Sequence, residues 1–211
     1  MIDRDAYLKD PCGTCSIPFW KAVRLTPLGH IHIVHERGFC PEEWINAADE
    51  PYFRLKHDLV GLKQPVVPVG FRVRPATLAE FSTHISQCYA NLRLAVEEAE
   101  RYQKHPVYCA DLWLAVEDCQ TGAIVATGIA ELDRELGEGV LEWIQVLKEY
   151  SGRGLGSFVV NELFWRMRGI TKFVTVSGQV NNPTCPEALY RKCGFTGADV
   201  WHVLSGIKNR V

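Results

Sequence analysis

A glycine-rich turn between a strand-like segment and a helix-like segment is the part of this sequence best suited to bind an anion. Residues 146–157 read Val-Leu-Lys-Glu-Tyr-Ser-Gly-Arg-Gly-Leu-Gly-Ser. Glycine allows close backbone approach to a ligand, and successive backbone N–H groups at the positive end of a helix dipole attract phosphate. The spacing therefore predicts a phosphate-binding loop that opens a helix.

Two familiar nucleotide-binding patterns do not fit this loop. A Walker loop has Lys followed by Ser or Thr after its last glycine, whereas Gly156 is followed by Ser157 and Phe158. A dinucleotide-binding loop has the spacing Gly-x-Gly-x-x-Gly and a carboxylate at the end of the next strand. Here the spacing is Gly-x-Gly-x-Gly, and the next predicted strand, 173–177, ends without a carboxylate. Nucleotide hydrolysis and dinucleotide binding are therefore disfavoured.

The loop resembles the pyrophosphate loop of the GNAT acyltransferases, in which a strand ending in Val is followed by Arg or Gln, x, x, Gly, x, and Gly or Ala. Here Val146 ends the strand, and Gly154 and Gly156 open the helix. Ser151 stands where the family usually has Arg or Gln. The backbone donors of the loop do not depend on that side chain.

A second resemblance to the same family lies downstream. Leu189-Tyr190 followed by Gly194-Phe195 is similar to the Leu-Tyr-x-x-x-Gly-Phe helix end of GNAT enzymes. Asn182 resembles the asparagine that contacts the pantetheine arm of coenzyme A in that family. Two motifs in the right order and spacing are far more specific than either motif alone.

The resemblance covers about residues 69–205 and implies the fold, the donor and the residues that bind it. The implied fold is α/β (α+β), with a central mixed, mostly antiparallel, twisted sheet flanked by helices. The implied donor substrate is acetyl-coenzyme A, and no metal is expected. The residues implied to bind it are Ile144, Val146, Ser151, Gly152, Arg153, Gly154, Leu155, Gly156, Ser157 and Asn182.

Acyl transfer to an amine needs a proton for the leaving thiolate and a group that takes a proton from the attacking amine. Tyr190 is the predicted general acid, since a phenol with a pKa of about 10 can protonate a thiolate at neutral pH. The alternative is that its ring only packs against Phe195. Glu142, on the strand before the loop, is the predicted base, and a surface carboxylate is the alternative. Glu131 and His84 are further candidate bases.

The resemblance implies direct attack by a primary amine of a small molecule or peptide on the thioester. Aromatic residues that could contact this acceptor are Phe81, Tyr89, Tyr102 and Trp143. Two other kinds of function stay open. One is a non-catalytic acyl-coenzyme A binding or sensing protein. The other is a metal- or thiol-dependent regulator that uses the cysteines near the N-terminus.

The composition of the chain limits the binding partners and the cellular compartment that we expect. The chain has 211 residues, 47% of them apolar, and a formal net charge of −2, with no basic stripe. Nucleic acid is therefore not an expected partner. The first residues lack the features of a signal peptide, and no uncharged run is long enough for a membrane span. We expect a cytoplasmic protein that contacts no membrane, as a monomer or homodimer.

The first part of the chain differs in composition from the rest. Seven of the eleven prolines precede residue 69, as do Cys12, Cys15 and four of the seven histidines. We predict that residues 1–66 form an extension packed on a catalytic domain at 67–211, joined by an extended linker at 64–68. His30, His32, His35 and Cys40 add donor atoms for zinc, but the spacing matches no strong zinc pattern. Packing is the favoured role of these residues.

The hydrophobic periodicity predicts the elements that position these residues. Thr77 and Glu80 form a capping-box pattern ahead of a broken helical region at 78–102, and a second helix begins at 155 and ends near Gly169. A short strand is predicted at 30–34. The remaining predicted elements are strands at 70–74, 111–117, 123–130, 140–147, 173–177 and 199–204, and a helix at 187–192.

Overall fold

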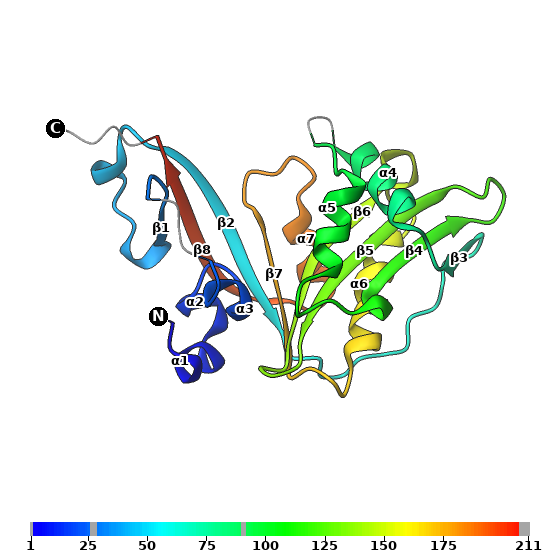
Figure 1. The fold of residues 1–211 in the computed structure, drawn as a ribbon, viewed down its shortest axis with the longest axis horizontal. Coiled ribbons are helices and arrows are strands. Elements are labelled where there is room, and N and C mark those ends of the chain that lie inside the picture. Colours follow the sequence, from blue (N-terminus) through cyan, green and yellow to red (C-terminus); the bar gives the residue numbers. More distant parts are fainter. Residues whose placement is uncertain (1, 26–28, 90–91, 207–211) are drawn as a thin grey trace. The chain divides into compact units, whose positions relative to one another are not determined.

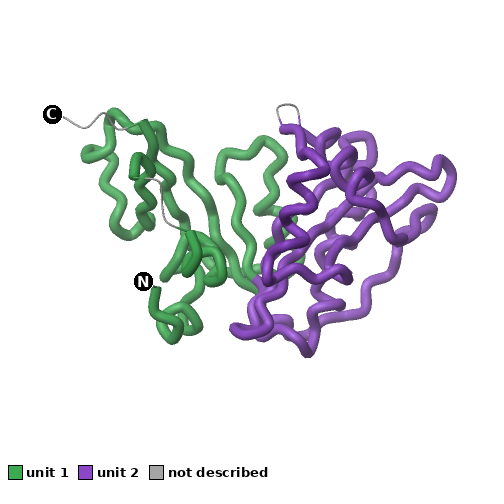
Figure 2. Tube along the Cα trace, viewed as in Figure 1, with its two compact units in different colours: residues 1–57, 175–211 green, residues 58–174 purple. Residues whose placement is uncertain are grey.

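The computed structural model describes residues 2–25, 29–89 and 92–206. Its contacts divide the chain into two compact units: residues 1–57 with 175–211 form unit 1, and residues 58–174 form unit 2 (Figure 2). The strands form an eight-stranded sheet in the order β1-β8-β2-β7-β6-β5-β4-β3 (Figure 1). The neighbours β1/β8, β2/β8, β3/β4, β4/β5 and β5/β6 are all antiparallel. The predicted α/β (α+β) class with a mostly antiparallel sheet is confirmed.

Unit 2 contains a run of antiparallel strands and three longer helices. Its elements are β3 Phe71–Arg74, α4 Leu78–Cys88, α5 Val96–Gln103, η3 Ala110–Leu112, β4 Trp113–Asp118, β5 Ile124–Asp133, β6 Glu138–Val146, η4 Lys148–Tyr150 and α6 Leu155–Met167. The helical region predicted at 78–102 is therefore two helices. Part of the predicted break between them, residues 90–91, lies outside the described residues.

The helices of unit 2 cover opposite faces of its strands (Figure 1). Phe81 and Ile85 of α4 and Ala99 of α5 form a buried cluster with Ala115 of β4 and Ile129 of β5. On the other face, α6 packs against β5 and β6. Each face thus buries its own apolar layer, which is what a two-faced sheet requires for stability.

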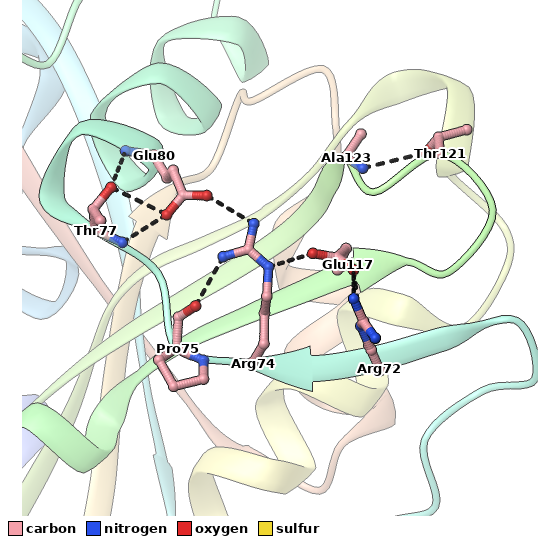
Figure 3. Close-up of polar contacts among 8 residues, drawn as sticks. All are labelled: Arg72, Arg74, Pro75, Thr77, Glu80, Glu117, Thr121 and Ala123. Atoms are coloured by element: carbon pink, nitrogen blue, oxygen red, sulfur yellow. Dashed lines mark hydrogen bonds and ion pairs between the residues drawn. The ribbon is translucent and has the colours of Figure 1, made fainter.

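The N-terminus of α4 is held by ion pairs to β3 and β4 (Figure 3). Thr77 and Glu80 form the predicted capping box, which is confirmed. Glu80 also accepts a hydrogen bond of 2.7 Å from Arg74, and Arg74 donates to Glu117 as well. Arg72 donates to the other oxygen of Glu117 at 2.8 Å. The Arg74 guanidinium lowers the pKa of Glu80 to about 2, so this carboxylate stays charged and keeps α4 in place.

Unit 1 joins the first and last parts of the chain. Its elements are α1 Arg4–Lys9, α2 Pro11–Thr14, α3 Phe19–Ala22, β1 His32–His35, η1 Glu36–Gly38, η2 Pro41–Trp44, β2 Ala48–His57, α7 Pro186–Lys192 and β8 Thr196–Ser205. Strand β7, Phe173–Gln179, begins in unit 2 and ends in unit 1.

Strand β8 pairs on both sides with strands from the beginning of the chain. β2 runs antiparallel to it from Ala48 opposite Ser205 to Lys56 opposite Thr196, and β1 pairs with its other edge. Strand β1 agrees with the short strand predicted at 30–34, whereas β2 was not predicted. The boundary between an extension at 1–66 and a domain at 67–211 stays a prediction, and residues 1 and 207–211 lie outside the described residues.

His202 of β8 connects these strands through two carboxylates. Its Nδ1 lies 2.9 Å from Asp49 of β2, and its Nε2 lies 2.6 Å from Glu36 of η1. The ring is buried and stacks on Phe39 with 3.6 Å between ring centroids. Burial disfavours the protonated ring, but hydrogen bonds and charge from Glu36 and Asp49 outweigh it and raise the pKa of His202 above its ordinary value.

We expect Asp49→Asn to weaken the fold in a pH-dependent way. A histidine whose pKa is raised on folding stabilises the fold fully below its unfolded pKa of about 6.5, and this contribution disappears as pH rises through the folded pKa. The free energy of unfolding of the wild type should therefore exceed that of the variant by about 1 kcal/mol at pH 5.5–6.5. The difference should shrink at higher pH, as measured by urea unfolding.

The control for this experiment is His30→Gln, because His30 is exposed to solvent. That substitution should leave the pH dependence of the free energy of unfolding unchanged. A constant difference between the wild type and Asp49→Asn from pH 5.5 to 9 would contradict the assignment.

Candidate active site

The loop after β6 adopts a conformation that two of its glycines make possible. Gly152 has φ +76° and Gly154 has φ +80°, in the left-handed region that side-chain-bearing residues avoid. A Cβ placed on either residue would meet no atom within 4 Å. Space is therefore open above the loop backbone, and these glycines are required by conformation rather than by crowding.

The helix that follows presents free backbone donors. Gly154 is the N-cap of the 13-residue helix α6, and no side chain among the described residues caps this end. The first intrahelical bond runs from Phe158 N–H to Gly154 C=O at 2.9 Å. The N–H groups of Leu155, Gly156 and Ser157 therefore precede the helical ladder and can donate to an anion.

Two residues of the loop, Ser151 and Arg153, make different contacts. Ser151 is exposed, and its N–H donates to Lys148 C=O at 3.1 Å, which closes the short helix η4. Arg153 lies over the ring of Tyr150, with 4.7 Å from its Cζ to the ring centroid. The pKa of Asp118 is lowered mainly by the backbone N–H of Gln120, with further contributions from Tyr150 and Arg153. Arg153 is thus a cation held at the edge of the loop.

Strand β6 leads into this loop with an irregularity at Glu142. Trp143 pairs with Ile129 and Leu141 pairs with Ala130, so Glu142 is the extra residue of a β-bulge. Strict alternation of side chains between the two faces of the sheet therefore does not hold through Glu142. Glu142 is half-buried, and its role as base stays a prediction.

Ile144 and Val146 have regular positions on the strand. They pair with Gly128 and Ala126 of β5. The Ile144 side chain reaches the position that a Cβ on Gly128 would occupy, beside Val159 of α6. It therefore packs toward α6.

The other candidate bases of unit 2 have partners. Glu131 is buried, and its Oε1 lies 3.4 Å from His105 Nδ1. His84 is buried on α4, where its Nδ1 lies 2.9 Å from the Thr127 hydroxyl. Burial lowers the pKa of His84, so the ring is neutral at physiological pH. These contacts give Glu131 and His84 roles inside the fold of unit 2.

Tyr190 and Asn182 belong to unit 1, whereas the loop, Glu142 and the other β6 candidates belong to unit 2. Tyr190 is 7% exposed, and its ring lies 6.2 Å from Phe53 and 5.6 Å from Phe195 between centroids. Asn182 is exposed, and its Oδ1 accepts hydrogen bonds from the Thr184 N–H and hydroxyl at 2.9 and 2.7 Å. The packing of Tyr190 is compatible with either interpretation given above for its role.

The sequence matches a known family model over the part that carries these residues. Residues 109–197 match the acetyltransferase (GNAT) domain. Residues 109–197 form a GNAT acetyltransferase domain. All the predicted catalytic and donor-binding residues lie within this GNAT domain, from Glu142 to Tyr190.

Solved structures share the fold of the chain. A GCN5-related N-acetyltransferase from Sphaerobacter thermophilus is 19% identical with a TM-score of 0.65, over 88% of this chain and 63% of that one. A Drosophila melanogaster protein is 18% identical with a TM-score of 0.58, over 77% and 52% of the two chains. A tandem GNAT protein from the clavulanic acid biosynthesis pathway is 17% identical with a TM-score of 0.56, over 74% and 53%.

The chain thus spans less than two thirds of each of these three structures. At these identities the likeness concerns the fold alone. No curated protein matches the sequence.

Cysteine and histidine residues that precede the GNAT domain contact residues of β8. Cys12 is buried, and its carbonyl accepts a hydrogen bond of 2.8 Å from Trp201 Nε1. His35 Nε2 lies 3.0 Å from Asp199 Oδ1. In the described part of the chain, no three His, Cys, Asp or Glu side chains are grouped so that they could hold a metal ion. No helix there has the length and apolar character to cross a membrane.

Two residues around the predicted sites were not predicted from the sequence. Phe53 of β2 packs against Tyr190, but β2 itself was not predicted. Gln145 of β6 is 6% exposed and carries a buried polar atom without a partner among the described residues. A signal for Gln145 was present, because it is a polar residue within the apolar stretch Trp143–Val146.

We expect Gly154→Ala to lower the free energy of unfolding by about 1 kcal/mol, because alanine is strained at positive φ. Gly122→Ala is a matched comparison, since Gly122 has φ +72° and open space around it in the β4–β5 turn. Urea unfolding should give similar losses for the two variants. A stable Gly154→Ala protein beside a destabilised Gly122→Ala protein would contradict the loop conformation.

Proposed function

We propose that the protein is an N-acetyltransferase that transfers an acetyl group from acetyl-coenzyme A to a primary amine of a small molecule or peptide. The observation that carries the proposal is the open, glycine-built N-terminus of α6. Its exposed donors suit a pyrophosphate, and it lies in the GNAT domain. The fold and family support acyl transfer, while the acetyl group and the amine are inferred.

The residues of the loop fit the donor that the family implies. The left-handed Gly152 and Gly154 leave the backbone open, and Leu155, Gly156 and Ser157 offer helix N-terminal donors. Arg153 adds a positive charge at the edge of the loop, and Ser151 adds a hydroxyl. Acetyl-coenzyme A supplies an acyl group activated as a thioester. In this proposal Asn182 binds its pantetheine arm.

The roles of the remaining residues follow from the balance of bonds and protons. The main chain from Ile144 to Val146 lines the thioester, and an N–H near Val146 donates to its oxygen. Such a donor is worth about 2.7–4 kcal/mol at an oxyanion. Glu142 takes a proton from the attacking amine as the C–N bond forms. Tyr190 gives its proton to sulfur as the C–S bond breaks.

The donor site is tested by measuring the binding of coenzyme A to two variants that each place alanine at a positive φ angle. Gly154→Ala should weaken binding about tenfold, equivalent to about 1.4 kcal/mol, because it disturbs the backbone that faces the pyrophosphate. Gly122→Ala should bind as the wild type does. Isothermal titration calorimetry measures both, and equal affinities of the two variants would place the coenzyme elsewhere.

The reaction is tested by release of free thiol from acetyl-coenzyme A with a panel of alkylamines, amino acids, polyamines and aminoglycosides. With a substrate amine, Tyr190→Phe should lower kcat about 100-fold, because the general acid is lost. The KM for acetyl-coenzyme A should stay nearly constant. Mass spectrometry of the amine should show one added acetyl group.

Tyr52→Phe provides the control, since Tyr52 of β2 is another tyrosine of unit 1, and its hydroxyl donates to Glu50 at 3.2 Å. It should leave kcat unchanged. Full activity of Tyr190→Phe would remove Tyr190 from the mechanism. Coenzyme A binding with no thiol release from any amine would favour the non-catalytic binding or sensing protein instead.

A further inference from the structure

Two polar atoms on β6 are buried without a hydrogen-bond partner among the described residues. They are Nε1 of Trp143 and Oε1 of Gln145. The first is a donor and the second an acceptor. A buried polar atom that stays unpaired destabilises the fold, so its presence in a folded protein calls for a physical explanation.

Both side chains lie on the face of the strands that α4 covers. Trp143 packs against the buried cluster that includes Phe81 of α4. Gln145 is paired across the sheet with Thr127, whose hydroxyl contacts His84 of α4. Gln145 is only 6% exposed, so bulk water does not compensate for the missing bond. The two atoms therefore belong to one layer of unit 2.

Gln145 has one unpaired amide atom whichever way its amide is oriented. Its Nε2 lies 3.2 Å from the Tyr89 hydroxyl and donates to it. If the amide is turned over, Oε1 accepts from the hydroxyl and Nε2 loses its partner instead. One of the two amide atoms is unsatisfied in either orientation.

Tyr89 contacts both side chains and is itself open to solvent. It follows the last residue of α4 and is 37% exposed. Its ring stands edge-on to Trp143, with 6.1 Å between centroids and an angle of 84°. A solvent-exposed side chain therefore borders the layer that holds the two unpaired atoms.

We propose that Tyr89, Trp143 and Gln145 recognise a neutral group of the acceptor that both donates and accepts a hydrogen bond, namely a hydroxyl or a carboxamide. Trp143 Nε1 donates to the oxygen of this group, and Gln145 Oε1 accepts from its O–H or N–H. The contacts described for these three residues are aromatic or uncharged. A charged group would therefore lose its hydration there without gaining a counter-charge.

This assignment rests on the proposed function, because it gives the recognised group to the amine that is acetylated. Gln145 directly precedes Val146, whose main chain is proposed to hold the thioester oxygen. A site whose polar atoms are satisfied only by the substrate discriminates strongly against analogues that lack the matching group. The three residues are therefore specificity determinants of the proposed reaction.

The test compares acceptors of equal size with and without the neutral polar group. One arm pairs amino alcohols of two to six carbons with alkylamines in which methyl replaces the hydroxyl. The other arm pairs amino-acid amides with branched amines of the same shape. The kcat/KM of the better polar acceptor should be at least ten times that of its apolar counterpart. Comparison of the two arms shows whether the site recognises a hydroxyl or a carboxamide.

The variants remove one polar atom at a time. Gln145→Met and Trp143→Phe should each reduce this preference about tenfold, the effect expected for one lost hydrogen bond. Gln145→Met should leave the midpoint of thermal unfolding unchanged or raise it, because the unpaired atom is gone. Gln103→Met is the matched control, since exposed Gln103 also donates to a tyrosine hydroxyl at 3.2 Å, that of Tyr108. It should leave the preference unchanged.

A second measurement does not depend on turnover. The indole N–H resonance of Trp143, assigned by its loss in Trp143→Phe, should shift when the preferred polar amine is added and stay in place with its apolar counterpart. A shift without thiol release would support this site and contradict the acetyltransferase proposal. Turnover with neither a preference nor a shift would overturn this site alone. A lower unfolding midpoint of Gln145→Met with an unchanged preference would also overturn it.

Discussion

Helix α6 can lie on strands β5 and β6 only because two strand positions carry no side chain. A Cβ on Gly128 would come within 2.4 Å of Val159, and a Cβ on Gly139 within 2.4 Å of Met167. Val159 and Met167 lie well apart on α6, so the helix is held against the sheet at two separate places along its length. The direction of its axis follows from these two contacts, and with it the place where its N-terminal donors point. The loop from Ser151 to Gly154 has only to connect the strand to a helix start that is already fixed.

The sequence was sufficient where structure depends on short-range chemistry. Three features arise from patterns of residues that are close in the sequence. They are the capping box of Thr77 and Glu80, the helix that begins at Leu155, and the strands of unit 2. The place of the glycine-rich loop was predicted for the same reason, but the positive φ angles of Gly152 and Gly154 were not. Local rules therefore predicted most of unit 2 and the position of its loop.

Features that depend on distant partners could not be predicted in this way. Strand β2 contains Pro51 and three charged residues before Lys56, so its sequence lacks the apolar alternation typical of strands. Its strand conformation comes from pairing with β8 and from burial of residues such as Phe53 and Leu55. The bulge at Glu142 could not be predicted either, because nothing in the residue types of β6 indicates an extra residue. Arg54 was missed as well. It is 1% exposed and donates to the Tyr7 hydroxyl at 2.8 Å and to Ser177 at 3.1 Å.

The double pairing of β8 has a consequence for the order in which unit 1 can be built. β1 and β2 lie within the first 57 residues, while β8 spans Thr196–Ser205. During synthesis the two early strands lack the neighbour they share until the chain has been extended beyond Ser205. The long loop that closes when they meet makes this a late and slow step compared with the local pairing of β4, β5 and β6. For much of its synthesis the nascent chain therefore exposes two unpaired strand edges, and this is the stage at which a chaperone would protect it most.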